Sequence, residues 1–545
     1  MDRELQDAAR LRAEVEAEPF VRNLGAYLDG LAQEMGDAPA ANFFEAGTVL
    51  SYREIADKTR ALAAGLSARG IRFGDRVGVM LPNIPAFPLT WLALARIGAI
   101  MAPINARYTP REVAYVLTDS GAETLVIEAG ILAEIAQAPE LKDLAALENP
   151  IVVGSDDPAG SSTQSWQHLA ETDATGFAPA REPELDDLIN IQYTSGTTGF
   201  PKGCMLSHRY WLTLSRVAAM RANGIVRNVL AAQPFYYMDP QWLLLMAMRL
   251  RGTLFVAAKA SGTNFLDWVR RYKLEYCIFP QILMKQPERP DDAELPLKMV
   301  SIFGHRREMH ATLEKRFNLV ARESFGMTEV GSALFTPYGA SSMVGSGTCG
   351  IPSPFREATI RDENGEEVRA GEIGELWIRG PGILQGYWNK PEANADSFRD
   401  GGWFRTGDLF RRDERGFHYI VGRIKDMIRR SGENIAAREV EAVMLSWPDI
   451  LEAAAIPVPD SDRGQEVKAC LVLKPGVDGK AFPVDAFLEH CAAHLAPFKV
   501  PRFVEIRSSL PKTPSEKVAK HMIIAERADL RAGAYDRLAR AWQPA

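Results

Sequence analysis

Short apolar segments alternate with helical segments along the N-terminal half of the chain, and this alternation limits the possible folds. The strand-like runs 76–83 and 124–130 are separated by stretches with helical character, such as 86–100. Strands that are apolar throughout and joined by helices are typical of parallel sheets covered by helices. Because the pattern returns between 253 and 304, we predict an α/β protein built from layered α/β subdomains.

The pattern changes after about residue 351. Residues 357–368 and 371–380 alternate in polarity around Asn-Gly and Gly turns, which predicts a small antiparallel β unit. The last part of the chain mixes short strands with helices at 436–446 and 483–495, which predicts a separate, small α+β unit. A chain of 545 residues is also too long for one hydrophobic core.

Composition excludes several classes of protein. A formal net charge of −7 argues against a general nucleic-acid binder. The five cysteines are scattered without CxxC spacing, which argues against a disulfide framework or a zinc ribbon and favours a reducing compartment. No apolar signal core or membrane-spanning run is present. We therefore expect a cytoplasmic protein, and a homodimer is compatible with the sequence.

A loop rich in hydroxyls and glycines, within "YTSGTTGFPKGCMLSH" (193–208), carries the strongest chemical signal. Glycines allow backbone N–H groups to approach an anion, hydroxyls donate further hydrogen bonds, and a lysine adds positive charge. The residue types fit a triphosphate, although a Ser/Thr-rich surface turn is the alternative. Neither a P-loop nor a dinucleotide fingerprint explains the loop, since "GSGTCG" (345–350) is followed by prolines that prevent the required helix.

The chain resembles the adenylate-forming enzymes, a family that includes acyl-CoA synthetases, peptide-synthetase adenylation domains and firefly luciferases. The resemblance covers nearly the whole chain, and its motifs follow one another in the family's order. They are "LSYREI" (50–55), "ARIGAIMAPIN" (95–105), "YTSGTTGFPKG" (193–203), "SFGMTE" (324–329), "GELWIRGPGILQGYW" (374–388), "WFRTGDL" (403–409), "GRIKDMIRRSGENI" (422–435) and "LPKTPSEK" (510–517).

The resemblance implies a large AMP-binding domain, residues 1–424, followed by a small mobile domain, residues 425–545, with the hinge at Lys425. ATP and CoA would be co-substrates, and Mg²⁺ the metal, held by Glu329. The implied ATP or AMP contacts are Thr194, Ser195, Gly196, Thr197, Thr198, Gly199, Lys202, Ser324, Phe325, Gly326, Met327, Asp408 and Arg423. The implied catalytic residues are Lys517, Thr328 and Glu329.

Each of these assignments has a simpler alternative. Asp408, which follows a glycine, could be a helix or turn cap, and Arg423 and Lys517 could be solvated charges. Lys517 also departs from the family pattern, because Glu516 replaces the glycine that usually precedes this lysine. The added negative charge could make the loop less pliable or offset the lysine's charge.

The expected activity is that of an AMP-forming acyl-CoA synthetase, in which a carboxylic acid is first activated as an acyl-adenylate. By resemblance, Ser431, Gly432 and Glu433 contact CoA. Two alternatives stay open: an adenylation enzyme that loads a carrier protein, and a nucleotide-binding module that has lost turnover.

The acid is less well defined by the sequence. The segments that line the acyl site in the family read "FYYMDPQW" (235–242) and "IFGHRREM" (302–309) here. They provide the candidate pocket residues Tyr236, Tyr237, Asp239, Trp242, Gly304 and His305. Bulky residues disfavour long fatty acids, and residues 230–330 have a weaker likeness to betaine/carnitine-CoA ligases. A cationic acid, a dicarboxylate and a neutral short or aromatic acid all stay open.

Overall fold

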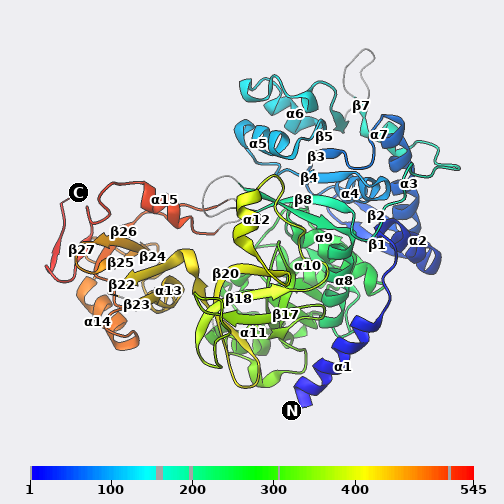
Figure 1. Ribbon diagram of the computed structural model, residues 1–545. Helices are drawn as coiled ribbons and strands as arrows, with labels where there is room; N and C mark the ends of the chain where they lie inside the picture. The colour runs from blue at the N-terminus through cyan, green and yellow to red at the C-terminus, as the bar shows by residue number, and fades with distance from the viewer. Residues whose placement is uncertain are drawn as a thin grey trace. The chain divides into compact units, whose positions relative to one another are not determined.

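The computed structural model describes residues 3–154, 164–194, 201–304, 307–431, 433–513 and 517–544. The chain divides into two compact units, whose helices and strands are labelled in Figure 1. Unit 1 comprises Met1–Thr194, Lys202–Ala358 and Ile378–Phe404, and unit 2 comprises Ser195–Pro201, Thr359–Trp377 and Arg405–Ala545. The functional boundary between residues 424 and 425 stays a prediction.

The first sheet of unit 1 has seven strands in the order β7-β6-β5-β3-β4-β8-β9. Their bounds are Arg76–Met80 (β3), Ile100–Pro103 (β4), Thr124–Glu128 (β5), Ile151–Val153 (β6), Gln164–Ser165 (β7), Leu188–Thr194 (β8) and Lys202–Ser207 (β9). All neighbouring strands are parallel except β8 and β9, which form an antiparallel pair. The sheet therefore ends in a hairpin whose connection is the loop rich in hydroxyls and glycines.

The second sheet of unit 1 has nine strands in the order β16-β15-β14-β13-β12-β10-β11-β1-β2. Their bounds are Pro39–Phe43 (β1), Thr48–Ser51 (β2), Asn228–Ala231 (β10), Thr253–Val256 (β11), Tyr276–Ile278 (β12), Met299–Ile302 (β13), Val320–Met327 (β14), Gly331–Phe335 (β15) and Ile351–Pro352 (β16). In this order, the six strands β14, β13, β12, β10, β11 and β1 are parallel to one another. At the two ends of the sheet, β2 pairs antiparallel with β1, β15 with β14, and β16 with β15.

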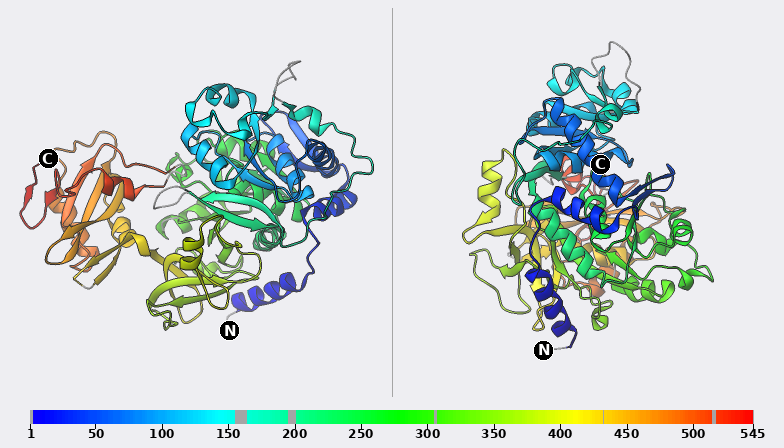
Figure 2. Two further views of the ribbon diagram at one scale, coloured as in Figure 1. Left: turned by 45° about the horizontal axis from the view of Figure 1, so that its top comes forward. Right: turned by 90° about the vertical axis from the view of Figure 1, so that its right-hand side faces the viewer.

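The helices of unit 1 precede, connect or follow these strands in the sequence. They are α1 (Arg3–Ala17), α2 (Leu24–Met35), α3 (Tyr52–Ala68), α4 (Ala86–Ile97), α5 (Pro110–Ser120), α6 (Ala129–Ile135), α7 (Trp166–Ala170), α8 (His208–Arg221), α9 (Met238–Arg249), α10 (Phe265–Tyr272), α11 (Arg307–Phe317) and α12 (Pro391–Ser397). Figure 2 shows α1, in dark blue, outside the layered strands of unit 1. Short 3₁₀ turns cover Pro139–Leu141, Ala145–Leu147, Gln281–Lys285, Asp292–Glu294 and Ser341–Met343.

Local sequence signals explain where several helices begin and end. A capping box joins Ser51 and Glu54 at the start of α3, and another joins Thr109 and Glu112 at the start of α5. Each box satisfies backbone N–H groups that the first helical turn leaves without partners. Helix α5 ends at Gly121, whose φ of 68° belongs to the left-handed region that favours glycine.

A third sheet contains the strands predicted after residue 351. Its order is β17-β18-β20-β19, with β21 paired to β20. The bounds are Glu357–Arg361 (β17), Ile373–Arg379 (β18), Phe398–Arg399 (β19), Trp403–Arg412 (β20) and His418–Arg423 (β21). Strand β20 is antiparallel to both β19 and β21. The chain passes from one unit to the other within β17, β18 and β20.

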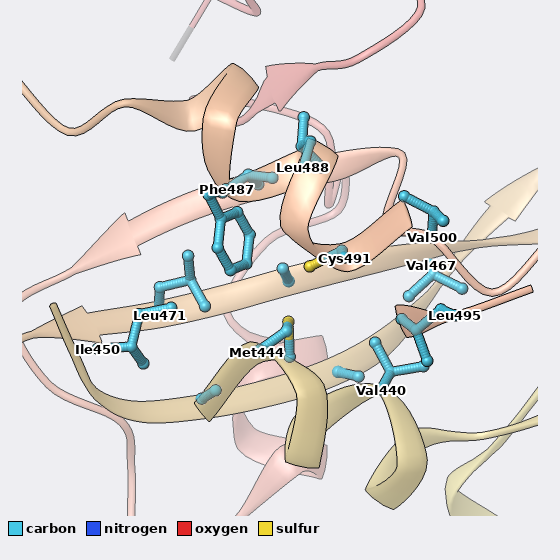
Figure 3. Packing of buried hydrophobic residues seen from close by; sticks show 14 of the residues in the cluster. Val440, Met444, Ile450, Val467, Leu471, Phe487, Leu488, Cys491, Leu495 and Val500 are labelled. Atoms are coloured by element: carbon cyan, nitrogen blue, oxygen red, sulfur yellow. The ribbon is translucent and has the colours of Figure 1, made fainter. Parts of the chain in front are cut away.

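The C-terminal part of unit 2 has its own sheet and core. The strand order is β23-β22-β25-β26-β27-β28, and β24 pairs with β25. The bounds are Met427–Arg430 (β22), Glu433–Ala436 (β23), Ile450–Asp460 (β24), Gly464–Leu473 (β25), Phe503–Arg507 (β26), Tyr535–Asp536 (β27) and Ala541–Trp542 (β28). Helices α13 (Ala437–Leu445), α14 (Val484–His494) and α15 (Lys520–Ala525) complete it. Figure 3 shows Met444 of α13 and Phe487 and Cys491 of α14 packed against Leu471 of β25.

These observations confirm the predicted fold class. The strands predicted at 76–83 and 124–130 and the helices predicted at 86–100, 436–446 and 483–495 are all present. The alternation predicted between 253 and 304 is also present, as β11, α10, β12 and β13. The segment "GSGTCG" is followed by β16 rather than by a helix, as its prolines predicted. All five cysteines are buried and free.

Two properties of the described residues bear on membranes and metals. No helix there has the length and apolar character needed to cross a membrane. Within the same residues, no group of three or more histidine, cysteine, aspartate and glutamate side chains could hold a metal ion.

Candidate active site

An antiparallel strand pair closes the base of the loop rich in hydroxyls and glycines. Thr194 at the end of β8 lies opposite Lys202 at the start of β9. The Thr194 Oγ1 hydroxyl donates to the Lys202 carbonyl at 3.4 Å. The predicted contacts Ser195, Gly196, Thr197, Thr198 and Gly199 lie outside the described residues. The structure thus fixes the two ends of the loop, and both predicted ligands at those ends are strand residues.

A tight turn presents Thr328 and Glu329 between β14 and β15. At Gly326, a Cβ atom would lie 2.6 Å from the Gly331 carbonyl oxygen, so a side chain at 326 would force the two strands apart. Gly331 itself has a φ of 65°, which glycine adopts without strain. The Tyr210 hydroxyl of α8 donates to the Thr328 carbonyl at 2.9 Å. Glycine packing and a buried phenol therefore hold the turn in place.

Glu329 is a buried carboxylate with a specific hydrogen-bond donor. The residue is 7% exposed, and the Tyr387 hydroxyl donates to its Oε1 atom at 2.9 Å. Burial, followed by the Glu329 charge, raises the pKa of the Tyr387 phenol. The phenol therefore keeps its proton and can donate. On the face of the same ring, the Lys202 ammonium lies 3.8 Å from the ring centroid, within cation–π range.

Arg356 fixes the backbone around this turn through hydrogen bonds to carbonyl groups. It is 2% exposed, and its guanidinium donates to the carbonyls of Val330 at 2.9 Å, Pro381 at 2.8 Å and Gly382 at 2.9 Å. The Val330 carbonyl follows Glu329 directly, and 381–382 lead to Tyr387. Loss of such a buried arginine would leave several carbonyls unsatisfied, at a cost of about 1–3 kcal/mol for each buried group.

The motif residues on β14 have different environments. Ser324 is buried, and its Oγ accepts a hydrogen bond from Arg221 at 2.9 Å, so its hydroxyl already has a protein partner. Phe325 and Met327 are partly buried, and Gly326 is exposed. The nucleotide contacts predicted for these four residues stay predictions.

The predicted acyl-site residues before and within α9 form two contacts. The Tyr236 and Tyr237 rings pack edge to face with centroids 4.9 Å apart. The Trp242 Nε1–H donates to the Asp239 carboxylate at 3.0 Å. Between these pairs, Met238 accepts a hydrogen bond from Thr328 Oγ1 at 3.5 Å. This last contact joins the Thr328 turn to the start of α9 within unit 1.

Three residues near these tyrosines were not among the predicted site residues. Asn105 Nδ2 donates to the Tyr237 hydroxyl at 3.3 Å, and the Asn105 side chain also accepts from the Arg107 backbone N–H at 2.9 Å. The positive charge of Arg107 lowers the pKa of both Tyr236 and Tyr237, against the larger raising effect of burial. Burial raises the pKa of Tyr108 to about 12. The available signal was their position, since Asn105 is the last residue of the quoted "ARIGAIMAPIN" motif and Arg107 and Tyr108 follow it closely.

The remaining predicted acyl-site residues lie after β13. Gly304 is exposed, and its backbone N–H donates to Glu323 at 2.5 Å while its carbonyl accepts from Gln281 at 3.0 Å. Its φ of 65° again favours glycine. His305 lies outside the described residues.

Asp408 and Arg423 form a pair within unit 2. They lie opposite each other on β20 and β21, and Arg423 Nε donates to the Asp408 carboxylate at 3.0 Å. The Asp408 side chain is 2% exposed, whereas that of Arg423 is 45% exposed. Asp408 lies within a strand and is therefore not a helix cap. Its buried carboxylate is held in one orientation by a neighbour that reaches solvent.

Lys425 lies in a one-turn 3₁₀ helix, Ile424–Asp426, that joins β21 to β22. The closing hydrogen bond runs from the Met427 N–H to the Ile424 carbonyl. A short irregular connection between two strands is a suitable place for a hinge.

The other predicted residues of unit 2 lie on turns and a strand end. Ser431 has a φ of 52° and donates its backbone N–H to Arg463 O at 2.9 Å. Glu433 begins β23, and Gly432 lies outside the described residues. Lys517 is exposed. Its backbone N–H donates to the Thr513 hydroxyl at 3.2 Å, and its carbonyl accepts from the Thr513 N–H at 2.7 Å.

Two family models match this chain. The model described as "AMP-binding enzyme" matches residues 28–388, and the model described as "AMP-binding enzyme C-terminal domain" matches residues 439–517. The first contains the two sheets of unit 1 and the Thr328 turn. The second contains most of α13, all of α14, and Lys517.

Known relatives extend over almost the whole chain. A crotonobetaine/carnitine–CoA ligase of Citrobacter koseri is 34% identical over 517 residues, 92% of this chain and 98% of the relative. The corresponding enzyme of Salmonella typhimurium is 32% identical over 518 residues, with the same coverage. The ATP-bound MatB of Rhodopseudomonas palustris is 27% identical, covers 92% of this chain and 98% of its own, and has a TM-score of 0.81. This chain therefore belongs to the AMP-binding enzyme family and, within it, to the AMP-forming acid–CoA ligases.

Proposed function

We propose that the protein joins a small carboxylic acid to CoA in two steps. A carboxylate oxygen attacks the α-phosphorus of ATP and pyrophosphate leaves. The CoA thiol then attacks the acyl carbon, AMP leaves with the carboxylate oxygen, and the thiol proton goes to solvent. The observation that best supports this proposal is the contact of Tyr387 with both Lys202 and Glu329, since the first step joins two anions and needs charge neutralisation.

The residues of unit 1 fit a bound Mg²⁺–ATP complex. Glu329 is a buried oxygen donor of the type that Mg²⁺ prefers. When bound, Mg²⁺ would shield the negative charge of the triphosphate. Lys202, with the loop that it closes, would contact the β- and γ-phosphates, and Thr328 would donate to the α-phosphate.

The residues of unit 2 have complementary roles in this proposal. Asp408 accepts hydrogen bonds from the ribose hydroxyls, and Arg423 fixes its carboxylate while contacting ribose or phosphate. Lys517 bridges the carboxylate and the α-phosphate during the first step. Rotation about Lys425 then removes Lys517 and brings Ser431 and Glu433 toward CoA. The alternative acceptor is a carrier protein in place of CoA.

We propose a betaine-type acid, which carries a quaternary ammonium group, as the substrate. Such a group has no N–H to donate and binds through aromatic faces and a nearby carboxylate. Tyr236, Tyr237 and Asp239 supply these features close to the Thr328 turn, and relatives at 32–34% identity are named crotonobetaine/carnitine–CoA ligases. Arg107 favours the opposite case, an acid with a second carboxylate, because its positive charge acts on both tyrosines.

A comparison of three acids tests the substrate proposal. γ-Butyrobetaine, its neutral carbon isostere 5,5-dimethylhexanoate, and the dicarboxylate glutarate are assayed for ATP-dependent pyrophosphate release with CoA. A cation site should favour the betaine over its isostere by about 1–2 kcal/mol in kcat/KM, and Asp239→Asn should lose most of this preference. Asp239 also accepts from Trp242, an interaction that asparagine can keep.

The matched variant is Arg107→Gln, which removes the positive charge beside the same tyrosines. It should leave the betaine preference intact or increase it. Equal rates for the betaine and its isostere in the wild type would contradict the cationic proposal. A preference for glutarate that disappears in Arg107→Gln would establish a dicarboxylate site instead.

A further inference from the structure

We propose that Tyr387 is a positioning residue that orients the Glu329 carboxylate for Mg²⁺–ATP, an inference that rests on the proposed function. Tyr387 lies 58 positions from Glu329 in the sequence. It was not among the predicted site residues, and none of the comparisons gives it a role. The argument depends on how firmly Tyr387 is held and on what its hydroxyl and ring contact.

The backbone around Tyr387 is attached to strand β9. The Gln385 N–H donates to the Met205 carbonyl at 2.9 Å, and the Met205 N–H donates to the Gly386 carbonyl at 2.9 Å. The Trp388 N–H donates to the Gly203 carbonyl at 2.8 Å. Tyr387 therefore behaves as part of an additional strand beside β9, the strand that begins at Lys202.

A side chain from α12 also fixes the position of Tyr387. The Asn394 amide accepts from the Tyr387 N–H at 2.7 Å and donates to the Tyr387 carbonyl at 2.9 Å. The Tyr387 side chain is buried, and its ring packs near Phe404 with centroids 6.5 Å apart. With its backbone and ring both held, the phenol oxygen has little freedom to move away from Glu329.

The hydroxyl contact constrains the carboxylate. Tyr387 donates to Glu329 Oε1 at 2.9 Å, so the phenol hydrogen is directed at the carboxylate. A hydrogen-bond donor behind a metal-binding carboxylate orients it, and loss of such partners costs about 10–100-fold in metal affinity.

The ring of Tyr387 contacts a positive charge, whereas its hydroxyl contacts a negative one. The Lys202 ammonium lies 3.8 Å from the Tyr387 ring centroid, so the same side chain holds a cation on its face and an anion at its hydroxyl. Phenylalanine at 387 would keep the ring and the Lys202 contact but remove the Glu329 hydrogen bond. The two functions of Tyr387 are therefore separable by one conservative substitution.

The test measures nucleotide binding rather than activity. Isothermal titration calorimetry gives the Kd for ATP with excess Mg²⁺ and with EDTA. The Kd in EDTA divided by the Kd with Mg²⁺ is called the magnesium effect. Tyr387→Phe should reduce this ratio by about 10-fold or more while leaving the Kd in EDTA within about threefold. The control is Tyr419→Phe, which removes an equivalent phenol–carboxylate bond to Asp413 at 2.9 Å in unit 2 and should leave the ratio unchanged.

Glu329→Gln separates this inference from the proposed function. If Glu329→Gln leaves the magnesium effect unchanged, the proposed metal role of Glu329 is wrong. If Glu329→Gln reduces it and Tyr387→Phe does not, only the positioning role is overturned. In the double variant, Tyr387→Phe should add little to Glu329→Gln, because the hydrogen bond acts through that carboxylate.

A second variant covers the case in which Tyr387→Phe is unstable. If its melting temperature falls below the assay temperature, Asn394→Ala removes the side chain that fixes the Tyr387 backbone and should reduce the magnesium effect in the same direction. An unchanged magnesium effect in a folded Asn394→Ala variant would then overturn the proposal.

Discussion

Lys517→Ala should reduce acid-dependent pyrophosphate release by about 100- to 1,000-fold, the size expected when one preorganised electrostatic contact to a developing charge is lost. The same variant should convert a synthetic acyl-adenylate and CoA to the thioester at close to the wild-type rate. In the proposed mechanism Lys517 bridges two anions only in the first step. The Lys517 side chain is exposed, and only the backbone of Lys517 forms the hydrogen bonds to Thr513, so the substitution should not disturb the fold.

Lys512→Ala is the matched control for this prediction. Lys512 forms an isolated antiparallel bridge with Val518, the residue after Lys517, and its ammonium pairs with Glu452 at 2.5 Å. It is therefore a nearby lysine with a different partner, and its loss should leave both half-reactions nearly unchanged. An equal loss of both half-reactions in Lys517→Ala, or a loss of neither, would remove Lys517 from the catalytic assignment.

Lys425→Pro should stop overall CoA-ester turnover while adenylation persists. Proline fixes φ near −65°, which matches the φ range of a 3₁₀ turn, and the closing bond from Met427 to Ile424 does not involve residue 425. The variant should therefore keep the local 3₁₀ turn at 424–426 and resist the reorientation that the second step needs. We expect thioester formation to fall on the order of tenfold or more, with a burst of pyrophosphate that does not continue.

The comparison variant is Lys425→Ala, which removes the ammonium but keeps rotational freedom at the same position. It should turn over at close to the wild-type rate. Rapid-quench measurement of pyrophosphate and acyl-CoA in parallel distinguishes the two steps. Full turnover in Lys425→Pro would place the hinge at another residue.

Local patterns in the sequence predicted those helices and strands that bury nearly all of their own side chains. The apolar run at 76–83 became β3, and the helix predicted at 86–100 became α4, because each element buries nearly all of its own side chains. The capping boxes at Ser51 and Thr109 are likewise short-range signals. Such features depend on neighbours a few residues apart, which a single sequence displays directly.

The contacts that organise the candidate site could not be predicted in this way. Tyr387 reaches Glu329 across 58 positions, and Asn105 reaches Tyr237 across 132. Residues 359–377 join unit 2 although a long segment separates them from residue 405. Periodicity and propensity carry no information about such distant pairings. The motifs identified the candidate catalytic and binding residues, and the structure was needed to show which side chains position them.

The central claim is that the acid is activated by transfer of one of its oxygens to AMP, and isotope transfer tests it most directly. The protein is incubated with Mg²⁺–ATP, CoA and the preferred acid labelled with ¹⁸O in both carboxylate oxygens, and the products are analysed by mass spectrometry. The account predicts acyl-CoA, pyrophosphate and AMP that carries one ¹⁸O atom. Unlabelled AMP, or ADP and phosphate in place of AMP and pyrophosphate, would contradict it.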